Sequence, residues 1–151
     1  TLTIMFSDDY FMKMALMEAE EALTEDEIPI GAVIVLNNKV IARGHNHTQL
    51  LNDVTAHAEM EAITAAANHL GAKYLNDCTL YVTVEPCVMC AGAIAWAQLG
   101  TLVYGASDPK RGFTTLNSPI LHPKTIVRSG VLGEECETIM KSFFEKKRIT
   151  K

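Results

Sequence analysis

The stretch from residue 79 to residue 106 constrains the fold more than any other part of this 151-residue chain. It reads "TLYVTV", then "PCVMCAGAIAWAQL", then "TLVYGA". The outer two runs are rich in the residue types that favour strands, and the run between them favours a helix. A strand–helix–strand crossover this short makes its two strands parallel. The sequence therefore predicts an α/β fold.

The first half of the chain predicts a helix, a hairpin and a second helix. Asp8 or Asp9 can cap the first helix, which should end by Ile28 because a proline follows. "IGAVIVL" and "KVIARG" flank Asn37–Asn38, a pair typical of a two-residue hairpin turn. A loop over 45–56 then leads to a helix that ends at Gly71. The predicted apolar stripes are Met12, Leu16, Ala19 and Leu23 on the first helix, and Met60, Ile63, Ala67 and Leu70 on the second.

The end of the chain completes the sheet and its helical cover. "TIVRSG" at 125–130 can add a fifth strand, and a last helix runs from about Glu134. We expect its inward side chains to be Cys136, Ile139, Met140, Phe143 and Phe144. The order of elements predicts a mixed sheet, antiparallel at its hairpin edge and covered by helices. Without internal repeats or linker-like stretches, residues 1–151 are expected to form one domain.

The composition indicates a cytoplasmic protein. No run approaches the roughly 18 apolar residues that a membrane span needs. The N-terminus lacks the basic start and apolar core of a signal peptide. In the cytoplasm the four cysteines are not expected to form a disulfide framework. Cys78 and Cys136, which have no close partner in sequence, are expected to be small buried apolar side chains.

The net charge of −5 is unevenly distributed along the chain. Residues 1–100 contain 4 Lys or Arg and 13 Asp or Glu, whereas residues 101–151 contain 9 and 5. Such asymmetry can mark a basic surface that meets an anion. The basic run "EKKRITK" at 145–151 can equally be a solvated helix end, where cations complement the helix dipole.

Cys87 and Cys90 lie three residues apart at the start of a predicted helix. A disulfide, a redox pair, a metal site and simple burial are all possible interpretations. A strand that leads into Cys-x-x-Cys at a helix start is also the thioredoxin arrangement, where the helix N-terminus lowers a thiol pKa. A redox pair leaves the second unusual stretch, "TAHAEMEA" at 55–62, without a role.

His57 and Glu59 open the second predicted helix as Cys87 and Cys90 open the third. Helix N-termini gather at the carboxyl ends of strands, which would bring these side chains together. One imidazole and two thiolates suit zinc, and no second Cys-x-x-Cys supplies a closing fourth ligand. Glu59 would then be placed to move a proton to and from a bound water. A structural zinc site or a redox site remains the alternative.

Two motifs carry a family resemblance. "HAE" at 57–59 and "PCVMC" at 86–90 resemble the H-x-E and P-C-x-x-C signature of zinc-dependent nucleobase deaminases. Longer matches, covering nearly the whole chain, resemble the bacterial tRNA-specific adenosine deaminases: "IPIGAVIV", Asn46, "NDVTAHAE", "TLYVTVEPCVMCAGAI" and "VYGASDPKRG". The resemblance implies a cytidine deaminase-like fold, with three α/β/α layers around a five-stranded mixed sheet.

The resemblance also implies an activity, the hydrolytic deamination of adenosine to inosine at the wobble position of tRNA. His57, Cys87 and Cys90 would hold one Zn²⁺ per subunit. Zinc-bound hydroxide would attack C6, and Glu59 would protonate the ring nitrogen before ammonia leaves. The alternative substrate is a free base or nucleoside, such as guanine, cytosine or a cytidine nucleotide. A non-catalytic zinc or thiol module is a third hypothesis.

Three further residues are carried over from the family as substrate-binding residues. Asn46 would bind the flipped base, although a loop asparagine can simply form an Asx turn. Ile30 would line the pocket, although an apolar strand residue is by default part of the core. Pro86 would aim the neighbouring backbone at the departing amine, although proline also suits the first turn of a helix.

Partners are implied by the resemblance in the same way. Family members are homodimers that bind a tRNA anticodon loop. Pairing of subunits could direct basic residues towards one RNA, namely Lys110, Arg111, Lys124, Arg128, Lys146, Lys147 and Arg148. The segment 113–125 departs from the family pattern, and its Phe113 could stack on a base or be a buried aromatic residue.

Overall fold

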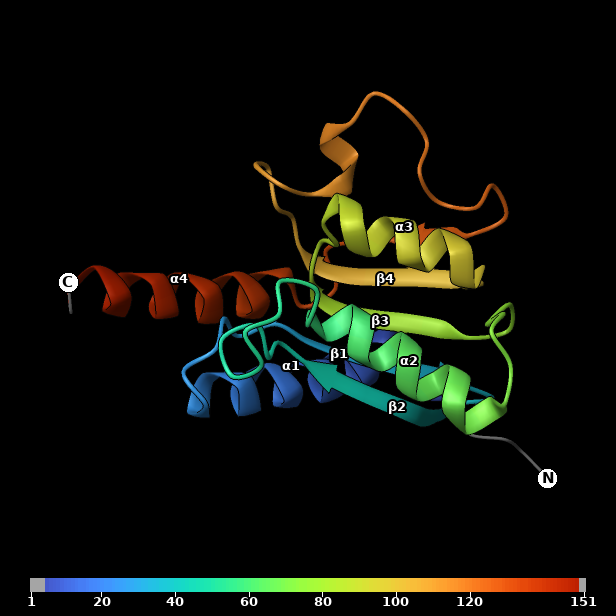
Figure 1. Cartoon of the computed structure of the whole chain (residues 1–151), viewed down its shortest axis with the longest axis horizontal. Coiled ribbons are helices and arrows are strands. Elements are labelled where there is room, and N and C mark those ends of the chain that lie inside the picture. Colours follow the sequence, from blue (N-terminus) through green and yellow to red (C-terminus); the bar gives the residue numbers. More distant parts are fainter. Residues whose placement is uncertain (1–4, 150–151) are drawn as a thin grey trace.

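A five-stranded sheet forms the centre of the computed structural model, which describes residues 5–149 (Figure 1). The strands are β1 (Gly31–Leu36), β2 (Lys39–His45), β3 (Thr79–Val84), β4 (Thr101–Ala106) and β5 (Ile126–Arg128). Their spatial order is β2-β1-β3-β4-β5. β1 is antiparallel to β2 and β3, whereas β3, β4 and β5 run parallel. The predicted mixed sheet, with its antiparallel hairpin edge, is confirmed.

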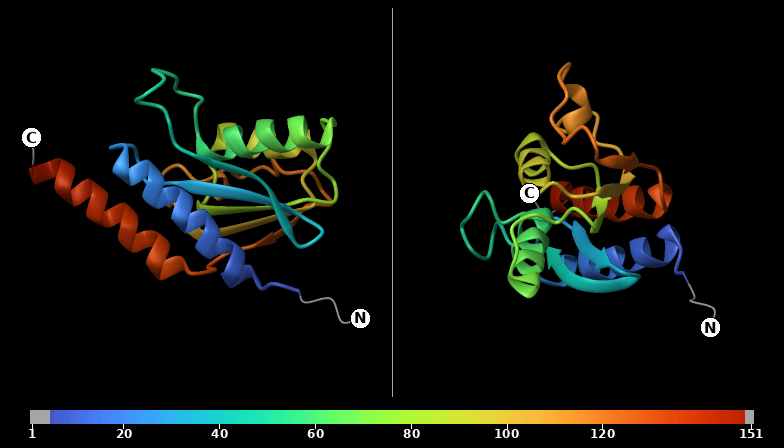
Figure 2. Two further views of the ribbon diagram at one scale, coloured as in Figure 1. Left: turned by 90° about the horizontal axis from the view of Figure 1, so that it is seen from below. Right: turned by 90° about the vertical axis from the view of Figure 1, so that its right-hand side faces the viewer.

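Helices cover both faces of this sheet, as Figure 2 shows from two sides. α1 (Asp8–Thr24) and α4 (Gly133–Ile149) lie on one face, and α2 (Ala58–Leu70) and α3 (Val88–Ala97) on the other. The three-layer α/β/α fold is therefore confirmed. Within residues 5–149, no helix is both long and apolar enough to cross a membrane.

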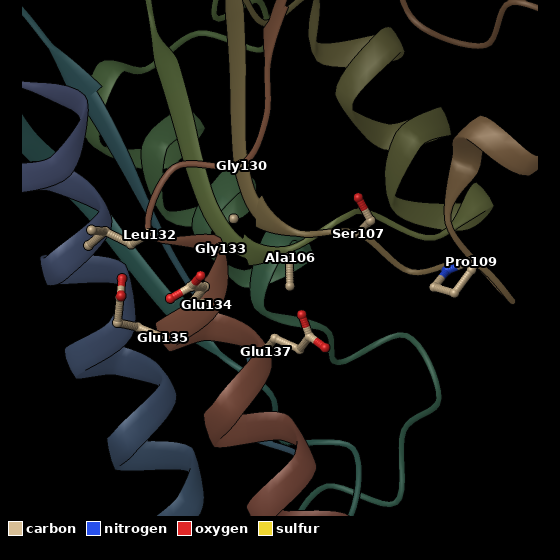
Figure 3. A pocket seen from close by; sticks show the side chains of 10 residues that line it. Ala106, Ser107, Pro109, Gly130, Leu132, Gly133, Glu134, Glu135 and Glu137 are labelled. Carbon is tan, nitrogen blue, oxygen red and sulfur yellow. The ribbon is translucent and has the colours of Figure 1, made fainter.

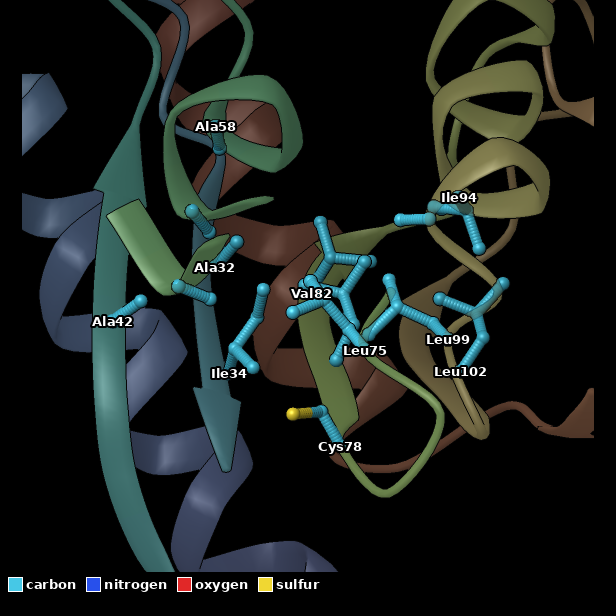
Figure 4. Packing of buried hydrophobic residues seen from close by; sticks show 14 of the residues in the cluster. Ala32, Ile34, Ala42, Ala58, Leu75, Cys78, Val82, Ile94, Leu99 and Leu102 are labelled. Atoms are coloured by element: carbon cyan, nitrogen blue, oxygen red, sulfur yellow. The ribbon is translucent and has the colours of Figure 1, made fainter. Parts of the chain in front are cut away.

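Each face of the sheet contributes to a separate apolar core. In β1, Ala32 and Ile34 point towards α2 and α3, whereas Val33 and Val35 point towards α1. The β1 sequence is continuously apolar because both faces of the strand are buried. Figure 4 shows the core under α2 and α3, which also contains Cys78. Cys78 and Cys136 are buried and form no disulfide, as expected.

The apolar stripe predicted for α2 is only partly correct, because Ile63 packs against the core but none of the four predicted residues is fully buried. Its buried apolar side chains are the small residues Ala58, Ala62 and Ala66, and Leu70 is 37% exposed. The helix lies so close to β2 that a side chain at Gly44 would collide with the backbone of Ala58. Only small residues fit at this distance, so the largest apolar residues do not mark the buried face.

Four helix details also differ from the sequence-based expectation. The N-cap of α1 is Ser7, whose hydroxyl accepts a hydrogen bond from the Tyr10 N–H at 3.2 Å, so neither Asp8 nor Asp9 caps this helix. Within the predicted α1 stripe, Leu16 and Leu23 are only half-buried. In α4, Phe143 is buried but Phe144 is 40% exposed. α3 begins at Val88 instead of Pro86, because Cys87 is an extended N-cap residue.

The predicted hairpin turn is confirmed. Leu36 pairs with Lys39, which leaves Asn37 and Asn38 as a two-residue loop. Both asparagines have positive φ, 51° and 64°. This is the backbone of a type I′ turn, in which asparagine is strongly favoured because it tolerates the left-handed region.

The Asp8 carboxylate joins three elements that are far apart in sequence. It accepts hydrogen bonds from the Tyr81 hydroxyl at 2.7 Å and from Arg128 Nε at 2.8 Å. These contacts connect the first turn of α1 to β3 and to the short, exposed strand β5. The Arg128 hydrogen bond, assisted by that of Tyr81, lowers the pKa of Asp8 against the opposing effect of burial.

We expect the Asp8→Asn variant to be less stable than the wild type by about 1 kcal/mol at pH 7, a small value because solvent screens partly exposed pairs. Because the folded pKa of Asp8 lies below its unfolded value of about 3.9, this contribution is present above that pH and is lost as the pH falls through the folded pKa. Urea unfolding at several pH values measures the difference. The matched control is Asp9→Asn, and equal effects of the two variants would contradict the prediction.

Candidate active site

The helices α2 and α3, which cover one face of the sheet, begin at the same end of that sheet (Figure 1). His57 is the N-cap of α2, and Cys87 is the N-cap of α3, three residues after the end of β3. Neither side chain caps its own helix. Cys90 lies in the first turn of α3. Both helix N-termini therefore present ligand-type side chains at one place.

His57, Cys87 and Cys90 form a candidate metal site. His57 Nδ1 lies 3.7 Å from Cys87 Sγ and 3.4 Å from Cys90 Sγ, and all three ligand atoms lie within 4.8 Å of one another. Tetrahedral zinc, with Zn–S about 2.3 Å and Zn–N about 2.0–2.1 Å, separates its ligand atoms by roughly 3.5–3.8 Å. The observed distances and the donor set fit such an ion.

The electrostatics of this site favour a thiolate. The hydrogen bond from Cys90 lowers the pKa of Cys87 most strongly, and the hydrogen bond from His57 lowers it further. Burial opposes both effects, and the resulting pKa of Cys87 is about 4. The same sharing of one proton between two sulfurs raises the pKa of Cys90, and the contact with Cys87 raises the pKa of His57. Helix N-termini add partial positive charge here. Cys87 is therefore held as a thiolate, the form in which a cysteine binds a metal ion.

Glu59 lies in the first turn of α2, next to the candidate metal site. Its side chain is only 4% exposed, and burial raises its pKa to about 7. The charge of His57 and a hydrogen bond with Cys90 lower the pKa of Glu59, whereas the charge of Cys87 raises it. A carboxyl group with a pKa near neutrality can both accept and donate a proton at physiological pH.

Asn46 and Ile30 lie side by side at the ends of neighbouring strands. The Asn46 N–H donates to the Ile30 carbonyl at 3.2 Å, and Asn46 Oδ1 accepts from the Thr48 N–H at 3.1 Å. The side chain of Asn46 thus forms the local turn considered from the sequence. Ile30 is half-buried against the core under α2 and α3, and it precedes β1 instead of belonging to it.

Pro86 is buried next to the thiol pair, outside the first turn of α3. Its carbonyl accepts a hydrogen bond from the Phe113 N–H at 2.9 Å. Phe113 is half-buried and packs edge-to-face on Tyr104, with ring centroids 6.2 Å apart. In this structure the ring of Phe113 belongs to the packing around the core.

Two buried glutamates that flank the site were not singled out from the sequence. Glu85 accepts hydrogen bonds from the backbone N–H groups of Asp108 at 3.1 Å and Thr114 at 3.0 Å. Glu27 accepts from the N–H groups of Gln49 at 3.0 Å and Leu50 at 2.8 Å. Each carboxylate holds one of the loops beside the site. The sequence gives only a weak indication of this role, because each glutamate is a single charged residue next to an apolar run.

A broad groove of about 780 Å³ lies elsewhere, at the start of α4 (Figure 3). It is lined by the end of β4, including Ala106 and Ser107, and by Glu134, Glu135 and Glu137 of α4. None of the residues expected at the active site lines it. The groove therefore lies apart from the candidate metal site and from Glu59.

The fold and the site together define a class of protein. The three-layer fold places His-x-Glu and Pro-Cys-x-x-Cys at the starts of two adjacent helices. These two motifs are the signature of the zinc-dependent nucleobase deaminases. The profile of the MafB19-like deaminases matches residues 6–148. The chain therefore belongs to the MafB19-like deaminase family.

Known proteins are similar over most of the chain. A tRNA-specific adenosine deaminase of Agrobacterium fabrum is 47% identical over 145 residues, which cover 93% of this chain and 95% of the relative. A solved structure from a study of A-to-I editing by tRNA:A34 deaminases is 47% identical with a TM-score of 0.81, covering 86% of this chain and 98% of that one. A guanine deaminase structure from Bacillus subtilis is 44% identical with a TM-score of 0.65, covering 68% and 66%.

We expect Glu85→Gln to loosen the loop over 108–114. Each carboxylate oxygen of Glu85 accepts from one backbone N–H, whereas glutamine has a single acceptor oxygen and an NH₂ group that can only donate. The loss should be about 1–3 kcal/mol of stability. Hydrogen exchange of the Asp108 and Thr114 amides measures the effect, and both should exchange faster. The exposed Glu134→Gln is the control. Unchanged exchange at both amides would show that Glu85 does not hold this loop.

Proposed function

We propose that this protein deaminates adenosine to inosine at the wobble position of a tRNA. The observation that carries the proposal is the convergence of His57, Cys87 and Cys90, with the buried Glu59 beside them. The high identity to a tRNA-specific adenosine deaminase supports the choice of substrate. A tRNA substrate further suggests that the protein acts in the cytoplasm.

In this proposal His57, Cys87 and Cys90 hold one Zn²⁺ per subunit. The ion would supply Lewis acidity that lowers the pKa of the attacking water. Two thiolates already neutralise the dication, so the water benefits from an adjacent base. The position of the three ligands at two helix starts supports this assignment, because the partial positive charge of a helix N-terminus favours the thiolate form that binds a metal.

Glu59 is the proposed proton carrier. Its carboxylate would accept a proton from the attacking water and deliver it to the ring nitrogen of adenine. Glu59 would then take the proton of the new C6 hydroxyl and pass it to the amino group at C6. The C6–N bond would break as the C6 carbonyl forms, so that adenosine and water become inosine and ammonia. The pKa of about 7, caused by burial, suits a group that must alternate between base and acid.

Asn46, Ile30 and Pro86 are proposed to bind the substrate, Asn46 and Ile30 by contacting the base and Pro86 by positioning the backbone beside it. Because Asn46 Oδ1 accepts from the Thr48 N–H, the side-chain nitrogen is the group that we expect to donate to the base. Ile30 would line the pocket from the adjacent strand end. The Pro86 carbonyl already accepts from Phe113, so Pro86 would act by orienting the neighbouring backbone.

We further propose that residues 1–151 act as one domain, within a homodimer that binds the anticodon loop. Some of the basic residues considered for RNA binding already have intramolecular partners. Arg128 pairs with Asp8, and Lys147 lies 2.8 Å from Asp26. Lys110, Arg111 and Lys124 are therefore the better candidates for phosphate contacts.

Glu59→Gln should lower the rate of deamination by about 10²–10⁴-fold, because the amide cannot carry the proton. Bound zinc, measured by elemental analysis, should stay at one ion per subunit, because Glu59 is not a proposed ligand. The exposed Glu20→Gln should retain full activity. A Glu59→Gln enzyme as active as the wild type would refute the mechanism.

The substrate is tested by incubation with tRNA that carries adenosine at the wobble position. Sequencing should detect inosine there, and guanine, cytosine and cytidine tested in parallel should remain unchanged. The similarity to a guanine deaminase makes a free base the second candidate substrate. Conversion of a free base, without inosine in the tRNA, would favour that candidate.

A further inference from the structure

A second group of ionisable side chains surrounds the carboxyl end of the edge strand β2. It consists of His45, His47, Glu18, Glu25 and Glu61, which we call the edge cluster. His45 is the last residue of β2, and His47 lies two residues further on. Glu18 comes from α1, Glu25 is the C-cap of α1, and Glu61 comes from α2. The edge cluster therefore joins helices from both faces of the sheet.

Each imidazole of the edge cluster lies between two carboxylates. His45 Nδ1 is 3.0 Å from Glu18 Oε1, and His45 Nε2 is 3.0 Å from Glu25 Oε1. His47 Nδ1 is 2.6 Å from Glu61 Oε2, and His47 Nε2 is 3.3 Å from Glu25 Oε2. The two rings lie 4.3 Å apart between centroids. Glu25 is thus shared by the Nε2 atoms of both histidines.

This arrangement needs positive charge at Glu25. A neutral imidazole has one N–H and one lone pair, so it can donate to only one of two carboxylates. If the Nδ1–H groups donate to Glu18 and Glu61, both Nε2 lone pairs face the Glu25 carboxylate. Arg43 Nη1 lies 3.9 Å from Glu18 Oε2, so this cation pairs with Glu18 and not with Glu25. Two additional protons, or one divalent cation, would remove the repulsion.

We propose that Glu25, His45 and His47 bind one divalent transition-metal ion, at a site separate from that of His57. The ligand atoms of these three residues lie within 4.8 Å of one another. Two imidazole nitrogens and a carboxylate oxygen form a donor set that suits Zn²⁺, Ni²⁺ or Co²⁺.

The outer carboxylates give the edge cluster the form of a metal site. Metal-binding histidines usually donate their other ring N–H to a carboxylate, which orients the ring and makes the ligand nitrogen more basic. Glu18 does this for His45, and Glu61 does it for His47. Two ordinary ion pairs would not require this arrangement, in which both rings contact the Glu25 carboxylate and each ring has a further carboxylate at its other nitrogen.

Accessibility and position indicate a structural ion. The Glu25 side chain is 36% exposed, and the His45 and His47 side chains are 14% and 20% exposed, so an ion could enter and keep water as further ligands. Asn46 lies between the two histidines in the chain. An ion here would tie the end of α1 to the start of the 45–56 loop and so steady Asn46.

The test begins with protein that carries no histidine tag and is already loaded with one zinc per subunit. Ni²⁺ is then titrated by calorimetry, and bound metal is counted after gel filtration. We expect one Ni²⁺ in addition to the zinc. His47→Gln should weaken Ni²⁺ binding by at least about 100-fold, and Glu61→Gln by about 10-fold. The exposed His69→Gln should bind as the wild type does.

A second measurement keeps the test decisive if His47→Gln does not fold. Ni²⁺ should raise the unfolding temperature of the zinc-loaded wild type, and this shift should be smaller in Glu61→Gln. Co²⁺ in the edge cluster should show visible absorption without the thiolate charge-transfer band of the Cys87 and Cys90 site. Absence of a further Ni²⁺, or equal binding by the wild type and Glu61→Gln, would overturn the proposal.

Discussion

The close approach of α2 to the sheet is the constraint on which the site depends. Gly44 of β2 leaves room for the backbone of α2 at Ala58, so the helix lies directly on the strand. This contact fixes the N-terminus of α2 beside that of α3, and with it the position of His57 relative to the two thiols. A bulkier residue at Gly44 would move the imidazole, whereas the 3.4 and 3.7 Å contacts tolerate little displacement.

Three buried glutamates near the site have different tasks because their hydrogen bonds differ. Glu27 and Glu85 each accept at least two backbone N–H groups, which compensates the cost of burying their charge. Glu59 is buried to a similar extent, but burial dominates its environment and raises its pKa to about 7. Two carboxylates therefore hold loops in place, and the third remains able to exchange a proton.

The two histidine sites suggest a division of labour around Asn46. The proposed zinc site at His57 combines two thiol groups with the buried carboxyl group of Glu59, which suits the proposed reaction. The edge cluster contains nitrogen and oxygen ligands backed by carboxylates and lacks a comparable buried acid. Its position at the start of the 45–56 loop places it where it could influence substrate binding through Asn46 without taking part in the chemistry.

The sequence by itself determined the strands, the antiparallel hairpin, the parallel pairing of 79–84 with 101–106, and the deaminase motif. These follow from local patterns: the runs at 79–84 and 101–106, the short crossover between them, and the spacing of Cys87 and Cys90. Only the tertiary structure decided which face of α2 is buried, because close packing selects small residues over large apolar ones. It alone revealed the edge cluster, since Glu18 and His45 are 27 residues apart in sequence and carry no local pattern.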